Sequence, residues 1–188
     1  MKGLSSLFLS LCTISLMLSF TFISCNNAKE LTSFDVVYNL PNIYFIYSQN
    51  DLKSTQVILY TGKLTINFDS ILGANHIPSG IISSAYLSKL AMIITAPPQA
   101  TFNWLASVNV YGSSDSTFQQ PILLGADTVN DPSAKNINLV LNNVDLKPIL
   151  YKYSYFVEIS ATPSGQAPAA SSINMYLVSQ IKLHIEPL

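Results

Sequence analysis

Apolar and polar residues alternate over residues 172–186, and this pattern limits the fold more than any other feature of the chain. The odd positions are apolar except for Ser179, and the even positions are mostly polar. A repeat of two is typical of a strand with one buried face, whereas a helix would scatter these apolar side chains around its circumference. We therefore predict a long strand that buries Leu177, Ile181 and Leu183.

Shorter runs with the same repeat recur along the chain, and turn-forming residues separate them. Gly62 interrupts one of these runs and predicts a bend or bulge there. Short helical turns are expected over 70–74, 102–106 and 144–150, and none is long enough for a crossover between parallel strands. The alternating runs occupy residues 34–38, 43–48, 58–68, 88–94, 108–110, 137–141 and 155–161.

Strands at this spacing, without long amphipathic helices, predict an all-β fold. We expect one antiparallel β-sandwich of about seven to nine strands over residues 33–188. Both an immunoglobulin-like and a jelly-roll topology fit the pattern. A chain of this length buries enough surface to fold without a disulfide or a metal.

The N-terminus has the layout of a secretory signal. Lys2 precedes an uncharged, largely apolar stretch over residues 4–24. The apolar stretch enters the membrane while Lys2 stays on the cytoplasmic side. A run of about 20 apolar residues also spans a bilayer, but eight Ser and Thr residues weaken this one as a permanent span. We predict that residues 1–24 are a signal peptide.

The end of this stretch, Phe22-Ile23-Ser24-Cys25, resembles the lipobox of bacterial lipoproteins. Ile23 and Ser24 fit the lipobox pattern, whereas Phe22 stands where Leu is usual. The resemblance covers the first 25 residues. It implies cleavage between Ser24 and Cys25 and attachment of several acyl chains, palmitate among them, to Cys25. Two or more acyl chains anchor a protein stably, whereas one holds it only marginally.

The use of cysteine agrees with this resemblance. Cys12 lies within the signal segment and would leave with it, so Cys25 is the one cysteine of residues 25–188. No intramolecular disulfide is then expected. We expect residues 25–32 to tether the domain to the lipid bilayer of the bacterial cell envelope, in the outer membrane.

The charge of residues 25–188 argues against nucleic acid as a partner. This part of the chain has eight lysines, no arginine and ten acidic residues. Nucleic-acid binding requires a basic patch or stripe, and arginine is the usual bidentate ligand of phosphate. The glycines form no phosphate-binding cluster, so no nucleotide cofactor is predicted.

The two histidines do not indicate a catalytic or zinc site. His184 lies between Lys182 and Glu186 on the polar face of the last predicted strand, which is typical of a solvated residue. His76 lies in a predicted loop with no Gly-x-Ser-x-Gly motif nearby. Two distant histidines without a free thiol do not make a zinc site. We predict no catalytic residue and no metal ligand.

One acidic loop is a candidate for calcium. Asp127, Asn130 and Asp131 cluster there, but Val129 and Pro132 occupy positions that an EF-hand loop gives to other residue types. We therefore expect these side chains to cap the backbone of their own turn.

Aromatic residues suggest where a ligand would bind. Tyr44, Phe45 and Tyr47 crowd one short segment. Aromatic side chains on a sheet surface can stack on sugars or become buried in a partner, whereas those in a sandwich core pack against each other. We expect core positions for at least half of them, and we expect Trp104 to cover one end of the core from a loop.

These observations favour a non-catalytic binding module with a protein or glycan partner. A hydrolase and a purely structural envelope component are the alternatives. The segments 102–111 and 141–148 resemble small, uncharacterised β-sandwich proteins of bacterial envelopes, a resemblance that implies no activity.

The lipobox resemblance generates a first prediction. Cys25→Ala should abolish lipidation, because the thiol that accepts the lipid is lost. Cys12→Ala is the matched control and should leave lipidation intact. Partitioning into a detergent phase measures the effect, and equal partitioning of wild type and Cys25→Ala would indicate a membrane span or an ordinary signal instead.

Overall fold

The computed structural model describes residues 33–48, 55–66, 72–73, 82–150 and 154–186. The signal segment, Cys25 and the tether lie outside these ranges. Within the described ranges, no helix has the length and hydropathy that crossing a bilayer requires.

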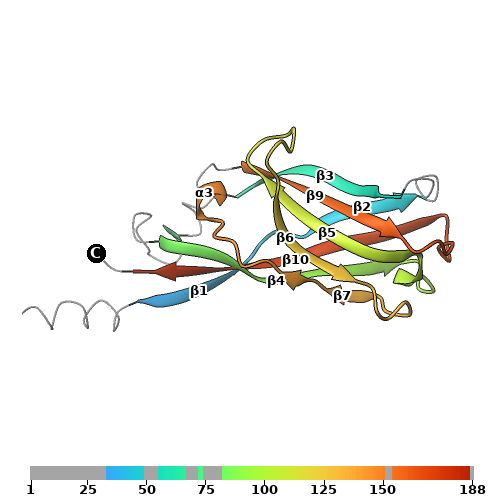
Figure 1. The fold of residues 1–188 in the computed structure, drawn as a ribbon. Coiled ribbons are helices and arrows are strands. Elements are labelled where there is room, and N and C mark those ends of the chain that lie inside the picture. Colours follow the sequence, from blue (N-terminus) through green and yellow to red (C-terminus); the bar gives the residue numbers. More distant parts are fainter. Residues whose placement is uncertain (1–32, 49–54, 67–71, 74–81, 151–153, 187–188) are drawn as a thin grey trace, which may run out of the picture.

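The described residues form two antiparallel five-stranded sheets packed face to face (Figure 1). The prediction of an all-β antiparallel sandwich is therefore confirmed. The first sheet contains β1 (Phe34–Asn39), β2 (Ile43–Ser48), β4 (Ile82–Ala96), β7 (Asn136–Asn138) and β10 (Ser172–Ile185). The second sheet contains β3 (Val57–Thr65), β5 (Leu105–Ser113), β6 (Ile122–Thr128), β8 (Val140–Leu141) and β9 (Ser154–Pro163).

The order of the strands decides between the two open topologies. β1 and β2 share one edge of β10, so together they act as one broken strand beside the last strand of the chain. β10 then pairs with β4, and β4 with β7, while the second sheet runs β3-β9-β5-β6-β8. An immunoglobulin-like sheet places its first two strands side by side. Here β1 and β2 together count as the first strand and β3 as the second. These two lie in different sheets, and the order is that of a jelly roll.

The inward face of β10 confirms the predicted parity. Its six apolar odd-numbered residues are at most 2% exposed, and Ser179 is 5% exposed. Burying a large apolar side chain contributes about 1.5–3 kcal/mol, so this strand is a major source of stability. The six residues are Ile173, Met175, Leu177, Ile181, Leu183 and Ile185.

The second sheet supplies the opposite wall of the core. Val108 and Val110 of β5 and Ile159 of β9 are fully buried. Trp104 lies in a one-turn 3₁₀ helix (Phe102–Trp104) directly before β5, not in an open loop. Its ring is fully buried and stacks on Tyr47 at 4.0 Å between ring centroids, as expected for a side chain that covers one end of the core.

The bulge in β3 lies at a different residue from the one predicted. β3 carries one extra residue between Ile58 and Tyr60 relative to β9. The extra residue reverses the parity, so Leu59 is buried and Ile58 is 59% exposed. Gly62 has another role, because a Cβ on this residue would overlap the ring of Tyr60. An aromatic ring over a strand glycine compensates for the missing side chain.

The 137–141 run also differs from a simple strand. Its inward parity is confirmed, with Ile137 and Leu139 buried. The chain nevertheless changes sheets within the run, since β7 pairs with β4 and β8 pairs with β6. The helical turn expected over 144–150 is shorter than predicted and forms α3 (Lys147–Leu150).

The packing of β10 generates a stability prediction. Leu183→Ala should lower the free energy of unfolding by about 2–5 kcal/mol, because it leaves a cavity in the core. Val37→Ala is the control, since Val37 pairs with Lys182 on the adjacent strand and is 58% exposed. It should cost about 0.5 kcal/mol or less. Denaturant titrations that rank the two variants in the opposite order would contradict the assignment of faces.

Candidate functional site

Several residues singled out by the sequence lie outside the described ranges. These are the cleavage and lipidation residues Ser24 and Cys25 and the loop histidine His76. Their predicted roles therefore stay predictions.

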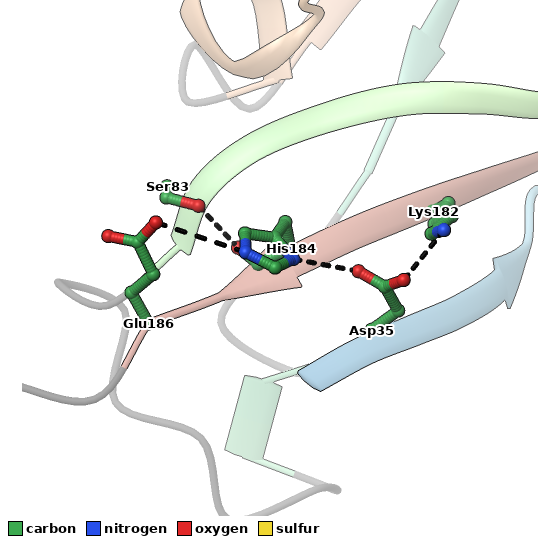
Figure 2. A network of polar contacts seen from close by, with 5 residues as sticks. All are labelled: Asp35, Ser83, Lys182, His184 and Glu186. Atoms are coloured by element: carbon green, nitrogen blue, oxygen red, sulfur yellow. Dashed lines mark hydrogen bonds and ion pairs between the residues drawn. The ribbon is translucent and has the colours of Figure 1, made fainter. Parts of the chain in front are cut away.

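His184 belongs to a polar network on the outer face of the first sheet, at the end where β1 begins and β10 ends. Its Nδ1 lies 2.8 Å from Oδ1 of Asp35, and its Nε2 lies 3.8 Å from Glu186. Asp35 also binds Nζ of Lys182 at 2.6 Å. Figure 2 shows these contacts, which extend from β1 across β10 to Ser83 of β4. The placement on the polar face agrees with the sequence.

The network does not have the geometry of a hydrolase triad. Ser83 Oγ donates to the backbone carbonyl oxygen of His184 at 3.2 Å and not to its ring. Because a carboxylate only accepts, Nδ1 must carry the hydrogen in its contact with Asp35. Nε2 is then the nitrogen that would serve as a base, and it faces Glu186. A triad requires this nitrogen to face the nucleophile.

Asp35 is the electrostatic centre of the network. The hydrogen bond from Lys182 and then the one from His184 lower the pKa of its carboxyl below the ordinary 3.8. The side chains of Asp35 and His184 are both 38% exposed. Such exposed pairs are well screened by solvent, and they stabilise a fold only weakly.

Asp131 binds the backbone of its own turn, as predicted, whereas Asp127 lies within β6 and not in that loop. Oδ1 of Asp131 accepts hydrogen bonds from the backbone N–H of Ser133 at 2.9 Å and from its hydroxyl at 2.6 Å. These bonds lower the pKa of Asp131, and the bond from the Ser133 hydroxyl has the largest effect. Among the residues that the structure describes, no three His, Cys, Asp or Glu side chains are grouped so that they could hold a metal ion.

An enclosed apolar cavity lies between the two sheets. The volume that the centre of a water molecule can occupy in it is about 20 Å³. One water needs about 10–15 Å³ on this measure. Ser179 and Tyr155 carry the hydroxyl groups of an otherwise apolar lining that includes Leu90, Leu124 and Leu146. Burial here raises the pKa of Tyr155 above its ordinary value. The cavity is too small for an organic ligand.

An open hollow of about 360 Å³ lies over β2, β10 and the end of β4. Phe45 and Met175 contribute to its lining, but their side chains are buried. The exposed lining therefore comes from Tyr44, Ile46, Thr95 and Asn174. None of these residues carries a charge. Small-ligand sites occupy about 300–1,000 Å³, so this hollow has the size of a binding site.

Tyr44 forms a wall of the hollow and is 71% exposed, and Ile46 is 63% exposed. Tyr44 pairs with Tyr176 across the sheet, and the two rings lie 5.5 Å apart at 34°. The crowded aromatic segment is thus divided, with Tyr44 outside and Phe45 and Tyr47 in the core.

Sequence reasoning did not identify the other residues of this site. Tyr176 was detectable as an aromatic residue on the polar face of β10. Asn174 and Thr95 carried no such signal, because strand pairing brings them together from distant parts of the chain.

No protein-family model matches the chain, and no curated protein matches it in sequence. A chain of Desmodium yellow mottle tymovirus is 14% identical with a TM-score of 0.30, and the match covers 83% of this chain and 90% of that one. The BFDV capsid protein is 12% identical with a TM-score of 0.37, and the match covers 82% of this chain and 95% of that one. A candidate secreted protein from Parabacteroides distasonis is 10% identical with a TM-score of 0.39, and the match covers 82% of this chain and 49% of that one. All three TM-scores are low, so we base neither fold nor function on these similarities.

The polar network generates a prediction about pH. The pKa of Asp35 is lowered in the fold, so its contribution to stability is present above the unfolded pKa and disappears as the pH falls through the folded one. Asp35→Asn should be less stable than wild type at about pH 6, and the difference should close towards about pH 2. Urea titrations at several pH values measure this.

Glu186→Gln is the matched control for Asp35→Asn. Its contact with His184 is the long one, at 3.8 Å, and the Glu186 side chain is 60% exposed. Its effect at about pH 6 should be the smaller of the two. A gap between Asp35→Asn and wild type that stays constant down to about pH 2 would contradict the role given to the carboxylate.

Proposed function

We propose that this chain is a lipid-anchored, non-catalytic binding protein of the bacterial cell envelope. Its anchor is Cys25 in the outer membrane, and its ligand-binding surface is the hollow over β2, β10 and β4. The lipobox resemblance of Phe22-Ile23-Ser24-Cys25 supports the anchor. The exposed aromatic residue Tyr44 supports the binding surface.

The exposure of Tyr44 and Ile46 is the observation that carries this proposal. Two large apolar side chains on one edge strand are more than 60% exposed, whereas their neighbours Phe45 and Tyr47 are buried. Leaving such groups in water forgoes the stabilisation that burial provides. Clustered exposed apolar groups with polar residues around them are typical of interaction sites.

The two ends of β10 separate the anchor from the binding surface. Phe34, near the tether, pairs with Ile185, whereas Ile46 pairs with Asn174. At about 3.3 Å per residue, these two points on β10 lie about 36 Å apart. Figure 1 shows β1 and the end of β10 together at one end of the sandwich. An N-terminal anchor would thus present the hollow away from the membrane, on a rigid scaffold.

The contacts of His184 support a function without catalysis. Its ring nitrogens face Asp35 and Glu186, and Ser83 does not contact the ring. A general base must reach the proton that it removes. Within the described residues, no second histidine is available to take this role.

Retention on isolated envelope material tests the proposal. In detergent, which prevents retention through the acyl chains, the full-length protein should sediment with lipid-free envelope material of its host, and Tyr44→Ala should reduce the bound fraction strongly, because a main contact surface is lost. Val140→Ala is the matched control, since Val140 lies in the other sheet and is 73% exposed. It should bind like wild type.

The same experiment separates binding from catalysis. The double variant His76→Ala and His184→Ala should be retained as well as wild type, and the envelope material should be chemically unchanged by mass spectrometry. Cleavage of the material that this double variant abolishes would establish a hydrolase instead. Equal retention of wild type and Tyr44→Ala would remove the hollow as the binding surface.

A further inference from the structure

The chemistry of the hollow narrows the class of ligand. We propose that it binds a neutral glycan, with a sugar ring lying against Tyr44 and hydroxyl groups hydrogen-bonded to Asn174 and Thr95. This inference rests on the proposed binding function and adds the kind of molecule that is bound.

The described residues of the lining carry no charge, and this favours a neutral ligand. Tyr44, Ile46, Thr95 and Asn174 are all uncharged, and the described charged network of Asp35, Lys182 and His184 lies at the other end of β10. A charged group that enters the hollow would lose hydration without gaining an opposite charge. Acidic sugars, phosphorylated groups and charged peptides are therefore poor fits.

The side chains of the hollow match the two kinds of surface that a sugar ring has. The exposed ring of Tyr44 is a flat apolar surface that suits the C–H face of a sugar. The exposed Asn174 side chain carries both a donor group and an acceptor. The hydroxyl of Thr95 donates to the backbone carbonyl of Asn174 at 3.1 Å, so its oxygen can still accept from a sugar hydroxyl.

The neighbouring ring of Tyr176 holds Tyr44 in place. The two residues are directly paired across β2 and β10, and their rings are 5.5 Å apart. A side chain that is packed on one side loses less freedom when a ligand binds, which favours binding of a small ligand. The platform is thus formed before the ligand arrives.

The size of the hollow favours a glycan over a protein surface. Six of the residues that the structure describes line it, whereas a stable protein–protein interface takes about 20–30 residues on each side. The strand residues next to it, such as Ser48 and Ser172, are small and polar. These dimensions fit one or two sugar rings of a longer polysaccharide.

Titration of the full-length protein in detergent with defined oligosaccharides tests the inference. The probes are neutral oligosaccharides of glucose, of mannose and of galactose, with an oligogalacturonate as the acidic comparison. At least one neutral probe should bind, and the acidic one should bind more weakly. Isothermal titration calorimetry measures the affinities.

Variants of Tyr44 show whether the hollow is responsible. Tyr44→Ala should weaken binding about tenfold or more, because the stacking surface is lost. Tyr44→Phe keeps the ring and should keep most of the affinity, and Val140→Ala should bind like wild type. Tyr44→Ala loses only the surface pair with Tyr176, so it should unfold cooperatively at a denaturant concentration close to that of wild type, which separates lost binding from lost folding.

The outcomes separate this inference from the proposed function. If no neutral probe binds but retention on envelope material still depends on Tyr44, the glycan assignment is wrong and the binding function stands. Stronger binding of the acidic probe, or a dimer that Tyr44→Ala dissociates in sedimentation, would also overturn the glycan assignment. Loss of both probe binding and Tyr44-dependent retention would overturn both.

Discussion

The burial of one face of β10 is the constraint on which the rest of the structure depends. This strand pairs with β1 and β2 along one edge and with β4 along the other, so it positions three strands of the first sheet. Its inward residues are fully buried against the second sheet. A slip of one residue would turn that whole face towards water, and the register of three neighbouring strands would change with it.

The outward face of β10 carries two different surfaces on the same strand. At one end Lys182 forms an ion pair and His184 a hydrogen bond with Asp35, and at the other end Asn174 and Tyr176 adjoin the exposed side chains of β2. This division is possible because side chains on the solvent face of a sheet contribute little to the core. The fold therefore fixes where these outer residues lie and leaves their chemistry open to function.

Sequence reasoning predicted the fold class because the buried faces follow a simple repeat. The parity of β10 is correct residue by residue, whereas in β9 the predicted inward residues are buried but Ser160 of the predicted polar face is buried as well. The repeat failed in β3, where one extra residue moved Ile58 outward and Leu59 inward. The two-residue repeat also could not predict the order of the strands in the sheets, because that order depends on pairing between distant segments. The hollow was only partly predictable for the same reason: Tyr44 stood out as an aromatic, whereas Asn174 and Thr95 meet it only through pairing.

The position of β1 has a mechanical consequence. β1 pairs with β10 in six successive register positions from Phe34 to Asn39. A pull between the N-terminal end of β1 and a ligand bound to Asn174 of β10 would act along these two strands, not across them. The ladder between β1 and β10 would then be loaded in shear, so that its hydrogen bonds share the force instead of breaking one after another.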